Sequence, residues 1–163
     1  FDNVTSLPNR NLLSDRLEEA IKRSHRGHHK FALLYVDLNK FKPINDELGH
    51  DAGDKALKFV AEQMKEFVRE TDTVARVDGD EFVVLLENVP DLDSVKQVAE
   101  KLLGKIAEPI EFSSGPRSLG AAMGIALHPE HGETRDELMT SADKAMYAAK
   151  ETGESCFRIS VQS

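Results

Sequence analysis

Three carboxylates crowd into one short stretch of the chain, "ARVDGDEFVVLLENV" at residues 75–89. Asp78, Asp80 and Glu81 surround Gly79 between two apolar runs that are typical of strands. The Asp-Gly pair is a strong signal for a tight hairpin, so these acids are predicted to share a hairpin tip, where they repel one another. Either the tip is a solvated turn, since acidic turns are common, or a cation binds there.

A further acid, Asp37, lies near the end of the compact apolar run "KFALLYVDL" at residues 30–38, which predicts a buried strand. If this strand pairs beside the hairpin, Asp37 comes close to Asp80 and Glu81 at one edge of the sheet. Such oxygen ligands suit a hard cation like Mg²⁺, which binds few carboxylates together with water and substrate phosphates. Gly79 lets the backbone approach a phosphate closely. This combination favours metal-assisted phosphoryl transfer.

Helices and strands alternate in the rest of the chain and must position these acids. Apolar residues at helical spacing predict long helices at residues 7–26, 55–68, 92–107 and 135–150. Residues 41–54 are expected to form a loop and a short helix. The last long helix is expected to place Met139, Met146 and Tyr147 in the core.

Three more strands complete the predicted sheet. "PIEF" at residues 109–112 and "SLGAAMGIAL" at residues 118–127 are expected to form a second hairpin around "SSGP", and "CFRI" to form a last short strand. This order of elements predicts an α+β fold, an α/β sandwich in which helices flank one mainly antiparallel central sheet.

The composition is that of an ordinary folded domain. With 163 residues, 40% hydrophobic and 31% charged, we expect a single domain over residues 1–163. The net charge of −8 argues against nucleic-acid binding, because a phosphate backbone would be repelled. The lone Cys156 cannot form an internal disulfide and fits a reducing compartment.

No apolar run reaches membrane-spanning length and no signal-peptide pattern opens the chain. We therefore expect a cytoplasmic domain that makes no membrane contact of its own. Because the chain begins at Phe1 without a methionine, we expect it to be excised from a larger multidomain protein, which could itself be membrane-anchored.

Five blocks of sequence resemble one family in the same order. "DGDEF" with "VVLL" resembles the signature hairpin of GGDEF domains, the diguanylate cyclases that join two GTP molecules into cyclic di-GMP. The other blocks are "DNVTSLPNR", "VDLNKFKPINDELGHDAGDKAL", "MGIALHPEHG" and "ADKAMYAAKETG". The resemblance runs from Phe1 to about Gly153 and implies the nucleotide-cyclase or palm-like GGDEF fold.

The resemblance implies roles for the acids. Asp37 and the backbone carbonyl of Leu38 would bind the metal, Mg²⁺ or Mn²⁺. Asp80 would be an acidic metal ligand and, in some schemes, the base for the 3′-hydroxyl. Glu81 would bind or support the metal beside it.

The resemblance also implies a GTP site. Asn45 and Asp54 would read guanine, because a carboxylate can accept from its N1–H and 2-amino groups. Lys42 and Lys150 would meet triphosphate oxygens, and Gly79 would lie close to a phosphate. Each residue taken alone has a structural alternative: Asn45 and Asp54 as helix caps, and Lys150 as a solvated cation at a helix end.

A regulatory pattern precedes the signature. "RETD" places Arg69 and Asp72 where the family has its R-x-x-D inhibitory site for cyclic di-GMP. The arginine suits a guanine edge or a phosphate, and the aspartate suits guanine donors. Lys101 is a candidate second cation. The structural alternative is a salt bridge at a helix end.

Two departures from the family pattern bear on turnover. Asp78 stands where the signature has its first glycine, and Glu154 stands where the family often has an arginine. Both replace a neutral or cationic group near the expected triphosphate with an acid, which raises the electrostatic cost of binding it.

Two functions follow. In the first, two GTP-loaded domains form a homodimer, at least transiently, and make cyclic di-GMP with release of pyrophosphate, under product inhibition. In the second, a degenerate domain binds GTP or cyclic di-GMP and regulates a neighbouring EAL phosphodiesterase domain without turnover. The opening "LPNRNLL" resembles GGDEF domains that precede an EAL domain, so the parent protein is expected to carry a C-terminal EAL domain and an N-terminal sensor.

Overall fold

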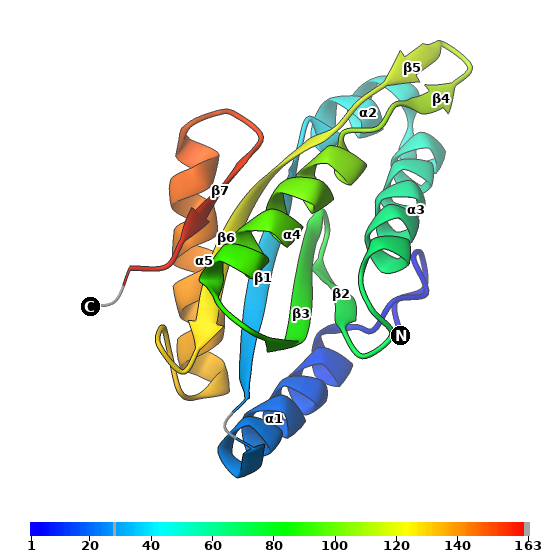
Figure 1. The fold of residues 1–163 in the computed structure, drawn as a ribbon. Helices are drawn as coiled ribbons and strands as arrows, with labels where there is room; N and C mark the ends of the chain where they lie inside the picture. Colours follow the sequence, from blue (N-terminus) through cyan, green and yellow to red (C-terminus); the bar gives the residue numbers. More distant parts are fainter. Residues whose placement is uncertain (28, 162–163) are drawn as a thin grey trace.

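A five-stranded sheet forms the centre of the chain, shown here by a computed structural model that describes residues 1–27 and 29–161 (Figure 1). The strand order is β2-β3-β1-β6-β7. The strands are β1 (Lys30–Asn39), β2 (Thr73–Asp78), β3 (Glu81–Val89), β6 (Gly120–His128) and β7 (Cys156–Ile159). Every pairing is antiparallel except that of β6 with β7. The prediction of a mainly antiparallel sheet is confirmed.

Helices cover both faces of this sheet (Figure 1). One face packs against α3 (His50–Phe67) and α4 (Leu92–Ile106), and the other against α1 (Arg10–Gly27) and α5 (Arg135–Glu151). Because β1 is central, its side chains are buried on both faces, which explains its unbroken apolar run. Even-numbered residues of β1 face α3 and α4, while Phe31, Leu33 and Tyr35 face α1 and α5.

Helix α5 lies very close to β6. A Cβ atom at Gly124 would lie 2.0 Å from the carbonyl oxygen of Ala142 and 2.3 Å from the amide nitrogen of Met146. Only glycine therefore allows this approach. The helix starts at a capping box, in which the Thr134 side chain accepts from the Glu137 amide and Glu137 accepts from the Thr134 amide. Its last turn carries Lys150 to the end of β1.

Two predicted segments differ in the structure. Residues 41–54 form α2 (Phe41–Leu48) and the first turns of α3, which begins at His50 rather than near Lys55. Part of this segment was expected to be a loop, but Gly53 lies inside the helix, where a Cβ would come within 2.4 Å of the Asn45 Oδ1 atom. The local sequence could not show this contact between two helices.

The predicted second hairpin is wrong in its partners. Strand β4 (Ile110–Phe112) pairs with β5 (Gly115–Arg117), whereas β6 pairs with β1. The apolar run of β6 needs burial on both sides, and only the central sheet provides it. Tyr147 was also expected in the core, but it is 63% exposed. No helix in the described part of the chain is long and apolar enough to span a membrane.

Candidate active site

The acids singled out from the sequence meet at one end of the sheet. In the antiparallel register of β1 with β3, Asp37 lies directly opposite Glu81. Gly79 and Asp80 form the turn between β2 and β3, and the Asp80 carbonyl accepts from the Leu38 amide at 3.0 Å. The first strand therefore does pair beside the hairpin, which was the condition for a shared site, and Asp37, Asp80 and Glu81 lie at one edge of the sheet.

Asp37 is an incompletely satisfied buried acid. The residue is only 3% exposed, and its Oδ2 atom accepts from Lys150 Nζ at 2.7 Å. Its Oδ1 atom is buried without a partner, one of two such side-chain atoms in the described residues. Leaving a carboxylate oxygen dehydrated and unpaired costs free energy, so this atom marks a position for a ligand.

The electrostatics of the site favour a cation. Burial and then the negative charge of Asp37 raise the pKa of Asp80. Burial also raises the pKa of Glu81, against the opposing effect of a hydrogen bond from Tyr35. The hydrogen bond to Asp37 raises the pKa of Lys150. Burial, with the neighbouring negative charge of Asp37, therefore makes Asp80 and Glu81 hold their protons more tightly than usual, and a bound cation would offset both effects.

The donor set fits a hard divalent cation. All three side chains offer carboxylate oxygens, and the buried Asp37 Oδ1 atom lacks a partner. In residues 1–27 and 29–161, no three acidic, histidine or cysteine side chains are close enough to form a ready-made metal cage. Mg²⁺ usually binds through one or two carboxylates and completes its shell with water and phosphate oxygens. The site therefore fits an ion that arrives with a substrate phosphate.

Arg76, which the sequence analysis did not single out, holds the signature turn. Its Nε atom donates to the Gly79 carbonyl at 2.8 Å, and its Nη1 atom donates to both Asp2 oxygens at 3.1 and 3.2 Å. Asp2 also accepts from the Thr5 amide and hydroxyl. The opening "DNVTS" thus anchors the turn, although only its resemblance to the family marked it in the sequence.

The expected guanine-reading residues lie on two helices. Asn45 is in α2 and Asp54 is in α3, and both are half-buried. The helix-cap alternatives are wrong, because α2 starts after Lys40 and α3 starts after Gly49. Lys42 is exposed in the first turn of α2.

Lys150 lies in the last turn of α5 with 51% of its side chain exposed, as the solvated-cation alternative expects, and it also pairs with buried Asp37. The two departures from the family pattern both face solvent. Asp78 is exposed, and one of its oxygens accepts from the Gly79 amide at 3.0 Å. Glu154 is exposed beyond the end of α5.

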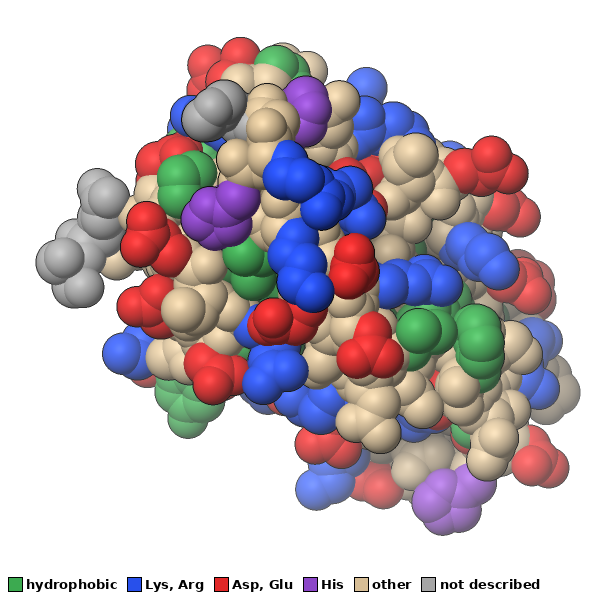
Figure 2. Space-filling view, turned by 90° about the horizontal axis from the view of Figure 1, so that it is seen from below, with side chains coloured by type: hydrophobic (Ala, Val, Ile, Leu, Met, Phe, Trp, Pro, Cys, Tyr) green, Lys and Arg blue, Asp and Glu red, His purple; other side chains and the backbone are tan. Residues whose placement is uncertain are grey.

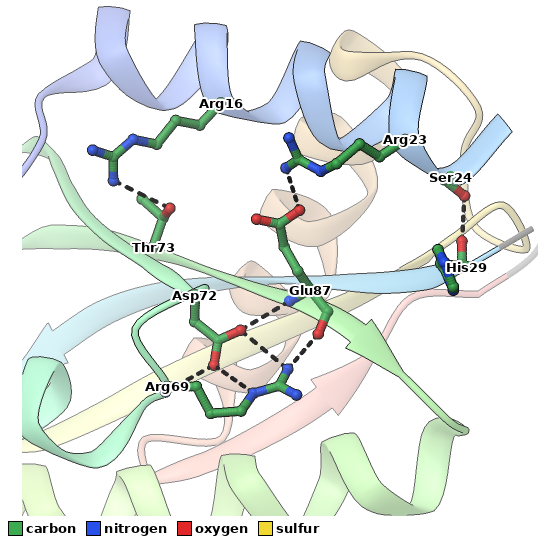
Figure 3. A network of polar contacts seen from close by, with 8 residues as sticks. All are labelled: Arg16, Arg23, Ser24, His29, Arg69, Asp72, Thr73 and Glu87. Atoms are coloured by element: carbon green, nitrogen blue, oxygen red, sulfur yellow. Dashed lines mark hydrogen bonds and ion pairs between the residues drawn. The ribbon is translucent and has the colours of Figure 1, made fainter. Parts of the chain in front are cut away.

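A second acidic centre lies at the other end of β3 (Figure 3). The Asp72 side chain is 2% exposed. It accepts from the Arg69 amide, Nε and Nη2 atoms and from the Glu87 amide, at 3.0–3.2 Å. Arg69 also donates to the Glu87 carbonyl, and Arg23 pairs with the Glu87 carboxylate. The salt-bridge alternative for Arg69 and Asp72 is therefore present in this structure.

This second centre borders a groove on the end face of the molecule. A band of Lys and Arg side chains, interspersed with acids, crosses the face near α1 (Figure 2). A cavity of about 590 Å³ opens there, and Arg23, Lys30 and Arg69 are among its lining residues. Lys101, the candidate second cation, is exposed on α4 and does not line this cavity.

Comparisons with known proteins show which family the chain resembles. Residues 1–156 match the family model described as "Diguanylate cyclase, GGDEF domain". The bifunctional diguanylate cyclase/cyclic di-GMP phosphodiesterase MucR of Pseudomonas aeruginosa is 48% identical over 158 residues, covering 96% of this chain and 23% of MucR. Diguanylate cyclase TpbB of the same species is 41% identical over 150 residues, covering 91% of this chain and 34% of TpbB.

Solved structures show the same fold. The crystal structure of the GGDEF domain of TpbB from Pseudomonas aeruginosa superposes with a TM-score of 0.93 at 38% identity, covering 98% of this chain and 99% of that chain. A GGDEF domain of a sensory box/GGDEF family protein from Caulobacter crescentus gives a TM-score of 0.88 at 37% identity, covering 93% and 98%. The chain spans only 23% to 34% of the length of MucR and TpbB.

Proposed function

The chain belongs to the GGDEF domain family, and from that premise we propose that it is a diguanylate cyclase domain. The proposed reaction joins two GTP molecules into cyclic di-GMP. Each 3′-oxygen forms a bond to the α-phosphorus of the other nucleotide, each bond between that phosphorus and the β-phosphate oxygen breaks, and two pyrophosphates leave with loss of the 3′-hydroxyl protons. The observation that carries the proposal is the buried, unpartnered Asp37 oxygen beside Asp80 and Glu81.

The chain's own residues would bind and orient the nucleotide. Asn45 and Asp54 would form hydrogen bonds with the guanine edge. The Asp54 carboxylate, which can only accept, would select guanine over adenine, which lacks the N1–H and 2-amino donors. Lys42 and Lys150 would meet triphosphate oxygens. Gly79 has no atom within 4 Å of a Cβ position, which supports a close approach of a phosphate to the turn.

The metal ligands would be Asp37, Asp80, Glu81 and the backbone carbonyl of Leu38. A bound Mg²⁺ or Mn²⁺ would neutralise phosphate charge and favour the ionised 3′-hydroxyl. Lys150 already neutralises one Asp37 oxygen, so the remaining oxygen is left for the cation. Asp80 would in addition accept the 3′-hydroxyl proton, since a positioned carboxylate can act as a general base.

The reaction requires two copies of the domain, so we also propose a homodimer, at least during turnover. One domain over residues 1–163 presents one such site, and each nucleotide must attack the other. We further propose that the domain works within a longer protein with an N-terminal sensor and a C-terminal EAL domain. MucR, named as both cyclase and phosphodiesterase, supports a phosphodiesterase neighbour.

Product inhibition at Arg69 and Asp72 is the regulatory part of the proposal. The Arg69 guanidinium is engaged with Asp72 and the Glu87 carbonyl, so cyclic di-GMP would have to replace these contacts. Arg69→Ala should relieve inhibition by added cyclic di-GMP while the initial rate stays measurable. Unchanged inhibition in this variant would refute the role of Arg69.

A turnover assay tests the main proposal. The domain is incubated with GTP and Mg²⁺, and cyclic di-GMP is separated by chromatography. We expect product from the unmodified chain and from Asp93→Ala, an exposed acid on α4, but none from Asp80→Ala.

A second function is favoured by Asp78 and Glu154, the two acids in positions where the family has glycine and arginine. The domain would then bind GTP or cyclic di-GMP and regulate an EAL neighbour without turnover. Absence of product in a covalently forced dimer that binds GTP would support this module and refute the cyclase.

A further inference from the structure

Tyr35 contacts the site without belonging to the signature. It lies on β1 two residues before Asp37 and faces the same side of the sheet, toward α1 and α5. The residue is only 6% exposed, and its hydroxyl donates to the Glu81 Oε1 atom at 2.9 Å. Since Glu81 lies opposite Asp37 in the β1–β3 register, Tyr35 approaches the acidic site from the core.

The two facing carboxylates are restrained by different donors. Lys150 holds one oxygen of Asp37, and Tyr35 holds one oxygen of Glu81. Carboxylates on adjacent strands repel, and a glutamate side chain has enough rotamers to turn away from its neighbour. A hydrogen bond from a buried ring, whose position is fixed by packing, removes that freedom.

The phenol is a donor over the physiological range, because an ordinary tyrosine keeps its proton up to a pH of about 10. The ring alone would serve for core packing, since Phe31 and Leu33 do so on the same face without a hydroxyl. The hydroxyl therefore needs a separate explanation.

We propose that Tyr35 is a positioning residue that holds the Glu81 carboxylate in place for the divalent cation of the nucleotide complex. This proposal rests on the proposed cyclase function. It assigns no contact between Tyr35 and the nucleotide itself. The expected consequence of losing the hydroxyl is weaker cation binding, with the reaction recovering when the cation is raised.

The chain provides its own probe, since it contains no tryptophan and only two tyrosines. Tyr35→Phe removes one hydroxyl from the site and keeps the ring. Tyr147→Phe is the matched control, because Tyr147 is exposed on α5. The intact domain and both variants are titrated with Mg²⁺ in the presence of a GTP analogue that cannot react at the α-phosphate. Tyrosine fluorescence and binding of Mn²⁺ by electron paramagnetic resonance are both recorded.

We expect the cation to change the emission of the intact domain and of Tyr147→Phe, but not of Tyr35→Phe. The half-saturating cation concentration should rise about ten- to a hundred-fold in Tyr35→Phe only, as expected for a hydrogen bond to a charged group. In turnover, the same variant should need more Mg²⁺ and reach a similar kcat at saturation. Urea unfolding should be nearly unchanged, which separates this role from a structural one.

Three results would overturn the inference. Equal cation affinity in all chains, with analogue binding intact, refutes the role of Tyr35 but leaves the cyclase proposal standing. A loss of kcat that excess Mg²⁺ does not restore means that Tyr35 acts otherwise than by positioning Glu81 for the cation. Failure of the unmodified domain to bind the analogue with either ion refutes the proposed function and this inference together.

Discussion

Two nearly buried aspartates mark opposite ends of the pairing between β1 and β3, and their surroundings differ sharply. Asp72 accepts four hydrogen bonds, three from Arg69 and one from the Glu87 amide (Figure 3). Asp37 accepts one, from Lys150, and keeps a buried oxygen without a partner. Both residues were predicted to contact ligands, yet of these two only Asp37 has a buried oxygen that lacks a hydrogen-bond partner.

The difference separates an acid that stabilises a loop from an acid that awaits a ligand. A carboxylate with a full set of donors contributes to stability, whereas one that lacks them, near others of its kind, destabilises the folded chain. Substitutions at the two ends should therefore act on different quantities, stability at Asp72 and activity at the Asp37 site.

The largest expected effect is at the acidic site. Asp80→Asn should lower the rate of cyclic di-GMP formation by about a thousand-fold, because several kcal/mol of transition-state stabilisation depend on the cation. The free energy of unfolding should stay the same or increase, since the variant removes a repelled charge. Rate measurements and urea unfolding on one preparation test both parts. A large loss of stability would remove the contrast between the two ends.

Asp72→Asn should instead cost stability. It removes the carboxylate charge that Arg69 faces and weakens the connection between residues 69–72 and β3. We expect a loss of about 2 kcal/mol in the free energy of unfolding, below the value for a fully buried pair because Arg69 is exposed. Urea denaturation measures it, with Asp93→Asn as the exposed control. Equal stability of both variants would mean that the Asp72 contacts contribute little.

A smaller gain should follow from restoring the family pattern. Asp78→Gly together with Glu154→Arg removes one acid and adds one cation near the proposed triphosphate site. Since both positions are exposed, we expect only a roughly three-fold rise in the turnover rate at low ionic strength. Repeating the assay in high salt should reduce the gain. An unchanged rate would refute the electrostatic account of these departures.

The smallest expected effect is on pH dependence. Folding raises the pKa of Asp80 and Glu81, so their protonated forms favour the folded chain. That stabilisation is complete below the unfolded pKa values, 3.8 and 4.5, and is lost as the pH rises through the folded ones. Without a cation, the free energy of unfolding of Asp80→Asn relative to that of the unmodified chain should therefore increase from acid to neutral pH. Melting temperatures at several pH values test this, and Mg²⁺ with GTP should reduce the difference.

Local patterns in the sequence predicted most of the fold. The apolar run at residues 30–38 and the Asp-Gly turn predicted β1 and the hairpin of β2 and β3, but the pairing of β1 with β3, which brings Asp37 beside Glu81, was only a condition that the structure then met. The start of α3 and the partner of β6 were missed because both depend on contacts between distant segments.

The same limit applies to the site. Its acids were visible in the sequence, but the donors that hold them were not. Lys150 was expected near phosphates and not against Asp37, while Arg76 and Tyr35 were not singled out at all. A side chain that restrains another across the fold leaves no spacing signal, since its partner lies tens of residues away.

Gly124 is a residue outside the acidic site on which the position of Lys150 depends. It makes no contact with the acids, yet it sets how close the axis of α5 comes to the sheet. Any larger residue there would push α5 away from the sheet. Lys150, whose ammonium group lies in the last turn of α5, would move with it. Substitutions at Gly124 should thus lower the catalytic rate although this residue lies outside the acidic site. A screen for variants with reduced activity should therefore find substitutions at this buried contact between α5 and β6.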